Sequence, residues 1–278
     1  MVILARLGRG VRSAAMWALL IVLAIVVLYP LVWMIMNALK TNAELFTDPF
    51  ALPASPLWQN FATAWRQGVG DFVLTSVSLT VLATLITELI SAWAAYGLTR
   101  VSIPLNRTFT VIVLAGLMLA PTVALIPLVK MFQGMGLYDS FLGLLILYTA
   151  FRIPFTVFLM RAYMLDLPRE VDEAASIDGA SRAATFWRII LPMSMPIIIT
   201  TIVLNVLQNW NEYLFAMVFT SGTGVQTLPV GLADLMSKNG TQYPVVFAGM
   251  VMAAAPMVIL FFVCQRYFVR GLAGGVGK

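Results

Sequence analysis

Histidine is absent from the chain, and Cys264 is its only cysteine. Without histidine, the sequence lacks the commonest general base and metal ligand of enzymes. A single cysteine excludes an internal disulfide and a thiolate metal cluster, so we expect Cys264 to pack as a small apolar side chain. These absences argue against a metal site and against an enzyme with chemistry of its own.

Charged residues are also scarce: they make up 10% of the 278 residues, whereas apolar residues make up 61%. Soluble domains carry about 25% charged residues. Charge this sparse cannot cover a surface that faces water, which predicts a protein that crosses a lipid bilayer several times. The net charge of +5 would suit nucleic acid, but we attribute it to membrane topology and expect no nucleic-acid partner.

A third absence concerns nucleotides. The sequence has no glycine-rich loop that ends in Lys-Ser or Lys-Thr, the loop that cradles phosphates in many ATPases. It also has no extracytoplasmic stretch long enough to capture a solute. We therefore expect no cofactor to be bound by this chain. If transport uses ATP, partner subunits must bind ATP and Mg and must capture the solute.

Six apolar stretches are long enough to cross a bilayer as helices, because a hydrocarbon core about 30 Å thick needs about 20 helical residues. They lie near residues 14–36, 72–96, 108–131, 141–164, 193–219 and 245–264, within one membrane domain of residues 1–278. The first stretch is too long for a signal peptide and no small-residue cleavage site follows it, so we expect it to be retained. Pro121 and Pro127 predict a kink or break in the third span.

Orientation follows from lysine and arginine, which are enriched in cytoplasmic loops. With the N-terminus placed inside, twelve such residues fall in the cytoplasm, four fall outside, and Arg152 lies within the fourth span. Both termini are then cytoplasmic. The twelve are Arg6, Arg9, Arg12, Arg100, Arg107, Arg161, Arg169, Arg182, Arg188, Arg266, Arg270 and Lys278, and the four are Lys40, Arg66, Lys130 and Lys238.

The most polar stretch of its length, residues 166–192, lies between the fourth and fifth spans, on the cytoplasmic side in this topology. Pro168 suits the first turn of a helix over residues 169–177, and Gly179 can adopt the left-handed conformation that ends a helix. Ser181 can cap a second helix through residue 190, and Pro192 breaks or kinks the path into the next span. This pair of short helices, which we call the finger, predicts contact with a soluble partner.

The finger carries a gap-free pattern over 20 positions: Glu173-Ala174-Ala175, Gly179, Ile189 and Leu191-Pro192. This pattern resembles the EAA loop of the membrane subunits of binding-protein-dependent ABC importers. Over nearly its whole length the chain resembles the carbohydrate-uptake branch of these permeases, close to the smaller membrane subunit of the maltose transporter. The resemblance is weaker at Thr75-Ser76, where the family often has Asn-Ser.

The resemblance implies an all-α membrane protein of six transmembrane helices with the type I ABC importer permease fold, in the bacterial cytoplasmic (inner) membrane. It implies three kinds of partner: a second permease chain of different sequence, two ATP-binding cassette subunits that bind ATP and Mg, and an extracytoplasmic solute-binding protein. The finger would dock in a groove of the ATPase as a coupling helix. The residues that the resemblance assigns to coupling are Glu173, Ala174, Ala175, Asp178, Gly179, Leu191 and Pro192.

The fifth span carries polar residues at three- and four-residue spacing, which places them on one helix face. Amide and carboxylate groups beside an aromatic ring suit a sugar, and Trp210-Asn211-Glu212 resembles a signature of the carbohydrate-uptake branch. The alternatives are hydrogen bonds between helices and contact with a docked binding protein. The candidate pathway residues are Asn205, Gln208, Asn209, Trp210, Asn211, Glu212 and, in the second span, Glu88.

Two charged residues inside spans have open roles. Glu88 shares a face with Thr80, Thr84 and Ser91, and either bonds to a neighbouring helix, in this chain or in a partner, or lines the pathway. Arg152 either reaches the bilayer surface or pairs with an acid.

The outer loop of residues 221–243 resembles the loop of the maltose permease that reaches into the binding protein. The residues concerned are Gln226, Thr227, Leu228, Pro229 and Gly231. The alternative is a lid that packs on its own helices. The tail, residues 271–278, departs from the family pattern that touches the ATPase, so its contact remains open.

The sequence therefore predicts the transmembrane permease subunit of an ATP-driven ABC importer that translocates a sugar or sugar derivative delivered by an extracytoplasmic binding protein. The competing class is an ion-coupled secondary sugar transporter in which Glu88 and Glu212 bind the ion. A membrane enzyme ranks last, because the chain has no histidine and no cluster of acids on one face.

Overall fold

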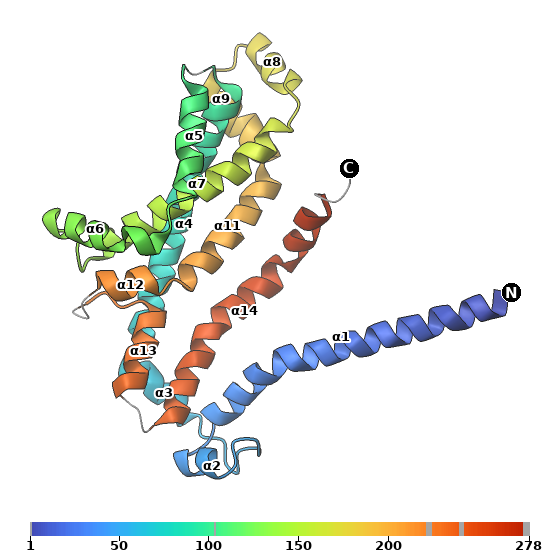
Figure 1. Cartoon of the computed structure of the whole chain (residues 1–278), viewed down its shortest axis with the longest axis vertical. Coiled ribbons are helices and arrows are strands. Elements are labelled where there is room, and N and C mark those ends of the chain that lie inside the picture. The colour runs from blue at the N-terminus through green and yellow to red at the C-terminus, as the bar shows by residue number, and fades with distance from the viewer. Residues whose placement is uncertain (1, 103, 221–223, 239–241, 275–278) are drawn as a thin grey trace. The chain divides into compact units, whose positions relative to one another are not determined.

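The computed structural model describes residues 2–102, 104–220, 224–238 and 242–274, with side chains described for residues 15–265 of these outside 238. Within these ranges every regular element is a helix (Figure 1). The elements are α1 (Val2–Ala38), α2 (Asn42–Thr47), α3 (Gln59–Ala64), η1 (Trp65–Val69), α4 (Gly70–Arg100), α5 (Asn106–Gly116), α6 (Pro121–Gly134), α7 (Phe141–Leu165), α8 (Glu170–Ile177), α9 (Arg182–Thr185), η2 (Phe186–Ile190), α10 (Leu191–Met193), α11 (Met195–Trp210), α12 (Leu214–Phe219), α13 (Leu228–Lys238) and α14 (Tyr243–Gly274).

Among the described residues, four helical stretches are long and apolar enough to cross a membrane: Ala15–Ala38, Gln59–Arg100, Phe141–Leu165 and Tyr243–Gln265. Two bent helix pairs raise the number to six if each pair is one span. The side chains of residues 15–30 in α1 are all exposed within the chain. An apolar surface of this size requires lipid or another apolar partner.

The chain divides into two units, of which the first comprises Met1–Gly70 and Leu232–Pro256. Its short helices are held by local capping and by side-chain bonds to the backbone. Thr41 caps α2, and its backbone N–H donates to the Glu44 carboxylate over 2.9 Å, which lowers the pKa of Glu44. The Asn60 amide donates to the carbonyls of Ala38 (2.8 Å) and Lys40 (3.0 Å), which closes the turn after α1.

The second unit comprises Asp71–Gly231 and Met257–Lys278, and both bent pairs lie in it. Helices α5 and α6 meet at 98°, and Pro121 occupies the first turn of α6, where its missing N–H costs no hydrogen bond. Arg182–Met193 and Met195–Trp210 meet at 76° around Ser194. The break predicted at Pro121 is therefore present, whereas α6 continues through Pro127.

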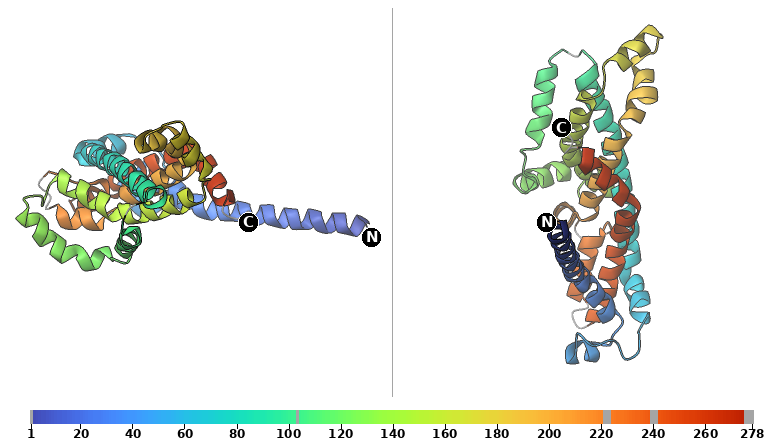
Figure 2. Two further views of the ribbon diagram at one scale, coloured as in Figure 1. Left: turned by 90° about the horizontal axis from the view of Figure 1, so that it is seen from above. Right: turned by 90° about the vertical axis from the view of Figure 1, so that its right-hand side faces the viewer.

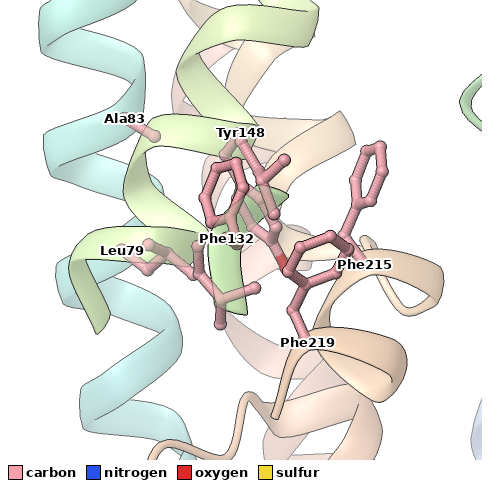
Figure 3. Packing of buried hydrophobic residues seen from close by; sticks show 8 residues of the cluster. Leu79, Ala83, Phe132, Tyr148, Phe215 and Phe219 are labelled. Atoms are coloured by element: carbon pink, nitrogen blue, oxygen red, sulfur yellow. The ribbon is translucent and has the colours of Figure 1, made fainter. Parts of the chain in front are cut away.

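An aromatic core joins four helices at one end of the second unit (Figure 3). The rings of Phe132 and Phe219 meet edge to face, with centroids 5.4 Å apart, a favourable arrangement of their charge distributions. Leu79 and Ala83 of α4 close the cluster, and both are fully buried. This core fixes α6 and α12 against the long helices α4 and α7.

Candidate functional site

The finger forms two short helices at one end of the second unit, where Figure 1 labels α8 and α9 and where the same yellow segment lies in the right-hand view of Figure 2. Helix α8 ends at Ile177, and Gly179 has φ +74°. Ser181 caps α9 by accepting a hydrogen bond from the N–H of Ala184 over 3.2 Å. The predicted left-handed glycine and the predicted serine cap are both confirmed.

The two faces of α8 differ in exposure. Glu173, Ala174 and Asp178 are exposed, and Ile177 is 87% exposed. Ala175, by contrast, is 4% exposed and packs against its own chain. The three residues of the Glu-Ala-Ala pattern therefore do not share one surface, because successive helical residues point about 100° apart.

The second helix of the finger attaches to α4 through aromatic packing. Phe186 and Ile190 are fully buried, and the Phe186 ring lies 4.3 Å from that of Trp93 and 5.2 Å from that of Tyr96, centroid to centroid. Leu191 is half-buried and Pro192 is exposed, so the predicted end of the coupling pattern lies at the root of the finger.

Sequence reasoning missed two features of the finger. One is Ile177, an apolar side chain in a polar segment, which the sequence itself displays. The other is the ion pair between Arg100 and Asp172, 2.6 Å apart. No sequence signal marked this pair, because 72 residues separate its members.

Within the spans, Glu88 of α4 accepts hydrogen bonds from two residues of α11. Its two carboxylate oxygens accept from the hydroxyl of Thr201 and the amide of Asn205, each over 2.8 Å. The same amide donates to the Thr156 hydroxyl of α7 over 3.0 Å. Glu88 and Asn205 are 7% and 1% exposed, so they join α4, α7 and α11 inside this chain.

Arg152 of α7 is the second charged group in this cluster. Its Nε donates to the Asn209 side-chain oxygen over 3.2 Å, and its Nη1 donates to the Gln208 side-chain oxygen. In the part of the chain that the structure describes, no acid lies within ion-pair distance of it. Asn209 also donates to Thr84 over 3.3 Å. Gln208 is exposed, whereas Asn209 is buried.

The predicted fifth span, residues 193–219, is not one helix, because α11 ends at Trp210, which is buried. The exposed Asn211 donates to the carbonyl of Leu207 over 2.7 Å and closes that helix end. The Glu212 carboxylate accepts from the N–H groups of Phe215 (2.8 Å) and Ala216 (3.1 Å). These are unpaired donors in the first turn of α12, so Glu212 acts as a helix cap.

The segment of residues 224–231 packs on its own chain. Thr227 and Leu228 are 2% and 1% exposed, and the Leu228 N–H donates to the Ser76 hydroxyl over 2.7 Å. A Cβ built at Gly231 would overlap the Phe72 ring, and Gln226 and Pro229 are half-buried. Residues 221–223 and 239–241 of this loop lie outside the described residues, as do residues 275–278 of the tail.

Metal ligands do not gather anywhere in the part of the chain that the structure describes: no three His, Cys, Asp or Glu side chains are placed to hold an ion. The two candidate sites are instead the exposed face of the finger and the polar cluster of α4, α7 and α11.

Glu88 provides a test of the polar cluster. Glu88→Ala leaves the Thr201 and Asn205 donors without their acceptor, which we expect to lower stability by about 1–2 kcal/mol. Glu88→Gln keeps one acceptor oxygen and the side-chain shape, so it should retain most of the stability and the transport activity. Thermal unfolding in detergent and cellular uptake measure both. Loss of uptake in a stable Glu88→Gln protein would mean that the charge itself is used.

Residues 89–274 match the family described as "Binding-protein-dependent transport system inner membrane component". The chain is 42% identical to the "Probable ABC transporter permease protein YurM" of Bacillus subtilis, over 96% of this chain and 89% of the relative. It is 32% identical to the "Diacetylchitobiose uptake system permease protein NgcG" of Streptomyces coelicolor, over 95% and 88%. It is 30% identical to the "Melibiose/raffinose/stachyose import permease protein MelC" of Bacillus subtilis, over 97% and 99%.

The fold is similar to that of a chain in the crystal structure of a bacterial ABC transporter involved in the import of the acidic polysaccharide alginate. The TM-score is 0.82 and the sequence identity is 24%, over 93% of this chain and 96% of that chain.

Proposed function

The chain belongs to the family of binding-protein-dependent transport system inner membrane components, so it is a multi-pass permease of ABC transporters, and on that premise we propose that it imports a sugar or sugar derivative. The proposal is supported by relatives that take up diacetylchitobiose, melibiose, raffinose and stachyose. The observation that carries it is the match of nearly the whole chain to such permeases.

The proposed partners are a second permease chain, two ATP-binding cassette subunits that bind ATP and Mg, and an extracytoplasmic solute-binding protein. The lysine and arginine distribution supports a cytoplasmic finger and cytoplasmic termini. A liganded binding protein docks outside and favours closure of the ATPases, closure moves the finger, and the spans turn from inward-open to outward-open. Such a cycle requires two states of similar energy whose populations the ligands shift.

The exposed face of α8 is the proposed ATPase contact. It consists of Glu170, Glu173, Ala174, Ile177 and Asp178, all exposed. Three carboxylates around one apolar side chain fit a basic groove with an apolar pocket. Ala175 and Leu191 act instead by holding the finger on its own chain. Gly179 turns the finger, and the exposed Pro192 lies in α10 at its root.

Of the candidate pathway residues, Gln208 and Asn211 reach the surface. We place the sugar contact of this subunit there, with Arg152 held beside Gln208. Gln208→Leu removes one polar contact worth about 1–1.5 kcal/mol, so the KM for uptake should rise about tenfold. Because Gln208→Leu also removes the acceptor of Arg152 Nη1, thermal stability is measured alongside uptake. An unchanged KM would exclude Gln208 from the pathway.

The ion-coupled alternative has less support from the geometry. Both carboxylates that it would use already accept hydrogen bonds within the chain: Glu88 from Thr201 and Asn205, and Glu212 from the N–H groups that begin α12. Among the described residues, the two acids that this alternative names are both engaged in hydrogen bonds, so neither is left to bind an ion.

The energy source that drives uptake tests the proposal. The sugar is identified first, by the thermal stabilisation that a panel of mono- and oligosaccharides gives the binding protein. Uptake of that sugar by cells should then stop on ATP depletion and persist when the proton and sodium gradients are collapsed. The reverse pattern would establish the ion-coupled carrier.

A further inference from the structure

Arg100, the last residue of α4, holds the end of α7 and the beginning of the finger at once. One guanidinium nitrogen, Nη2, donates to the carbonyls of Met164 (2.5 Å) and Leu167 (2.7 Å). The other, Nη1, donates to the Asp172 carboxylate over 2.6 Å. The Arg100 side chain is 4% exposed and that of Asp172 is 25% exposed. The contact is therefore largely removed from water.

The chemistry of arginine suits this position. Helix α7 ends at Leu165, and the last carbonyls of a helix have no partner within it. A positive charge at that end is also favoured by the helix dipole. The guanidinium carries five N–H groups in a rigid fork, so one side chain can serve a helix end and a carboxylate simultaneously.

A second bond fixes the other helix of the finger to the same part of α4. The Tyr96 hydroxyl, one turn before Arg100, donates to the Arg182 carbonyl at the start of α9 over 3.2 Å. Tyr96 also packs with Phe186 and Ile190 in one buried cluster. Both helices of the finger are therefore fastened to the last two turns of α4. Helix α7 packs on the same cluster through Met160 and Met164, and Arg100 adds hydrogen bonds to the end of α7.

We propose that Arg100 is a positioning residue that makes the finger, α4 and α7 move together, so that displacement of the finger by the ATPase is passed to two membrane helices. The proposal rests on the proposed function. Arg100 and Asp172 form the one ion pair found among the described residues, and its charge-assisted bonds are stronger than neutral ones. The Tyr96 bond reaches only α4, whereas Arg100 bonds to α7 and α8 through one side chain.

Hydrogen exchange of backbone amides tests the proposal. The full complex is reconstituted in lipid nanodiscs and compared with and without ATP in the presence of EDTA, which permits nucleotide binding but removes the Mg needed for hydrolysis. In the wild type, ATP should change exchange in the finger and at the ends of α4 and α7. In Asp172→Asn the change should remain in the finger and become smaller in α7. The direct bond from α8 to Arg100 is weakened, while the bonds of Arg100 to the α7 carbonyls and the packing of Met160 and Met164 persist.

Asp166→Asn is the matched control, because Asp166 is an exposed acid of the same segment and the substitution removes the same charge. It should respond as the wild type does. Equal responses of Asp172→Asn and Asp166→Asn in α7 would overturn the role of the ion pair. A wild-type complex without an ATPase, or without any response in the finger, would instead overturn the proposed function and the role of Arg100 with it.

Arg100→Lys gives an independent result if Asp172→Asn does not assemble. A lysine ammonium keeps the charge, but its single nitrogen cannot donate to the carboxylate and to both carbonyls at once. The response of α4 should survive in this variant, whereas that of α7 should become smaller, because only the packing of Met160 and Met164 then holds α7 to the cluster. A normal response in α7 would show that the fork of Arg100 is not needed.

Discussion

Gly179→Val is expected to reduce import strongly while leaving ATP hydrolysis by the assembled partners. Gly179 has φ +74°, a conformation that costs a non-glycine residue about 1–3 kcal/mol and is worst for a β-branched one. A Cβ built there meets nothing within 4 Å, so the penalty comes from the backbone alone. The turn between α8 and α9 must then open, which displaces the docking face of α8. Uptake should fall by about tenfold or more.

Gly179→Asn is the control for this prediction, because asparagine tolerates the left-handed conformation and has a size similar to that of valine. It should retain most of the uptake. Uptake of labelled sugar and ATP hydrolysis by the purified complex are measured for both variants. Normal import by Gly179→Val would show that the turn is not part of the coupling.

Ile177→Asp is expected to release the ATPase from the permease. Ile177 is 87% exposed, whereas Trp187, the other exposed large apolar side chain of the finger, is 47% exposed. Its burial in a partner pocket would contribute about 1.5–3 kcal/mol, and placing a charge there costs more. The dissociation constant for the ATPase should therefore rise at least about tenfold to a hundredfold, while the stability of the permease itself should not change.

Ile177→Leu keeps the apolar volume and should bind the ATPase nearly as well as the wild type. Biolayer interferometry measures binding of the purified ATPase to permease in nanodiscs for the wild type, Ile177→Asp and Ile177→Leu. Equal affinities for wild type and Ile177→Asp would remove Ile177 from the interface.

Local chemistry explains what could be predicted from the sequence. The turn at Gly179, the cap at Ser181 and the break before Pro121 each depend on the conformational limits of one residue. Such limits act within a few residues, so they can be recognised in the sequence without knowledge of the fold.

Contacts between residues far apart in the sequence explain why other features could not be predicted. The orientation of α8, and with it the burial of Ala175 and the exposure of Ile177, depends on Asp172 meeting Arg100 across 72 residues. The role of Glu88 was open until α11 placed Thr201 and Asn205 beside it. The start of α12 depends on Glu212, which accepts hydrogen bonds from the N–H groups of Phe215 and Ala216. The apolar run of residues 193–219 hid this cap, because it predicted one continuous span.

A photo-crosslinking amino acid at position 177, with the same group at position 175 as the inward-facing control, tests the central claim most directly. Cells expressing the full importer are irradiated, and the adduct is purified through a tag on this chain and identified by mass spectrometry. The account predicts an adduct between position 177 and the surface of an ATP-binding cassette subunit, and none from position 175. Adducts confined to lipid or to the chain itself would contradict it.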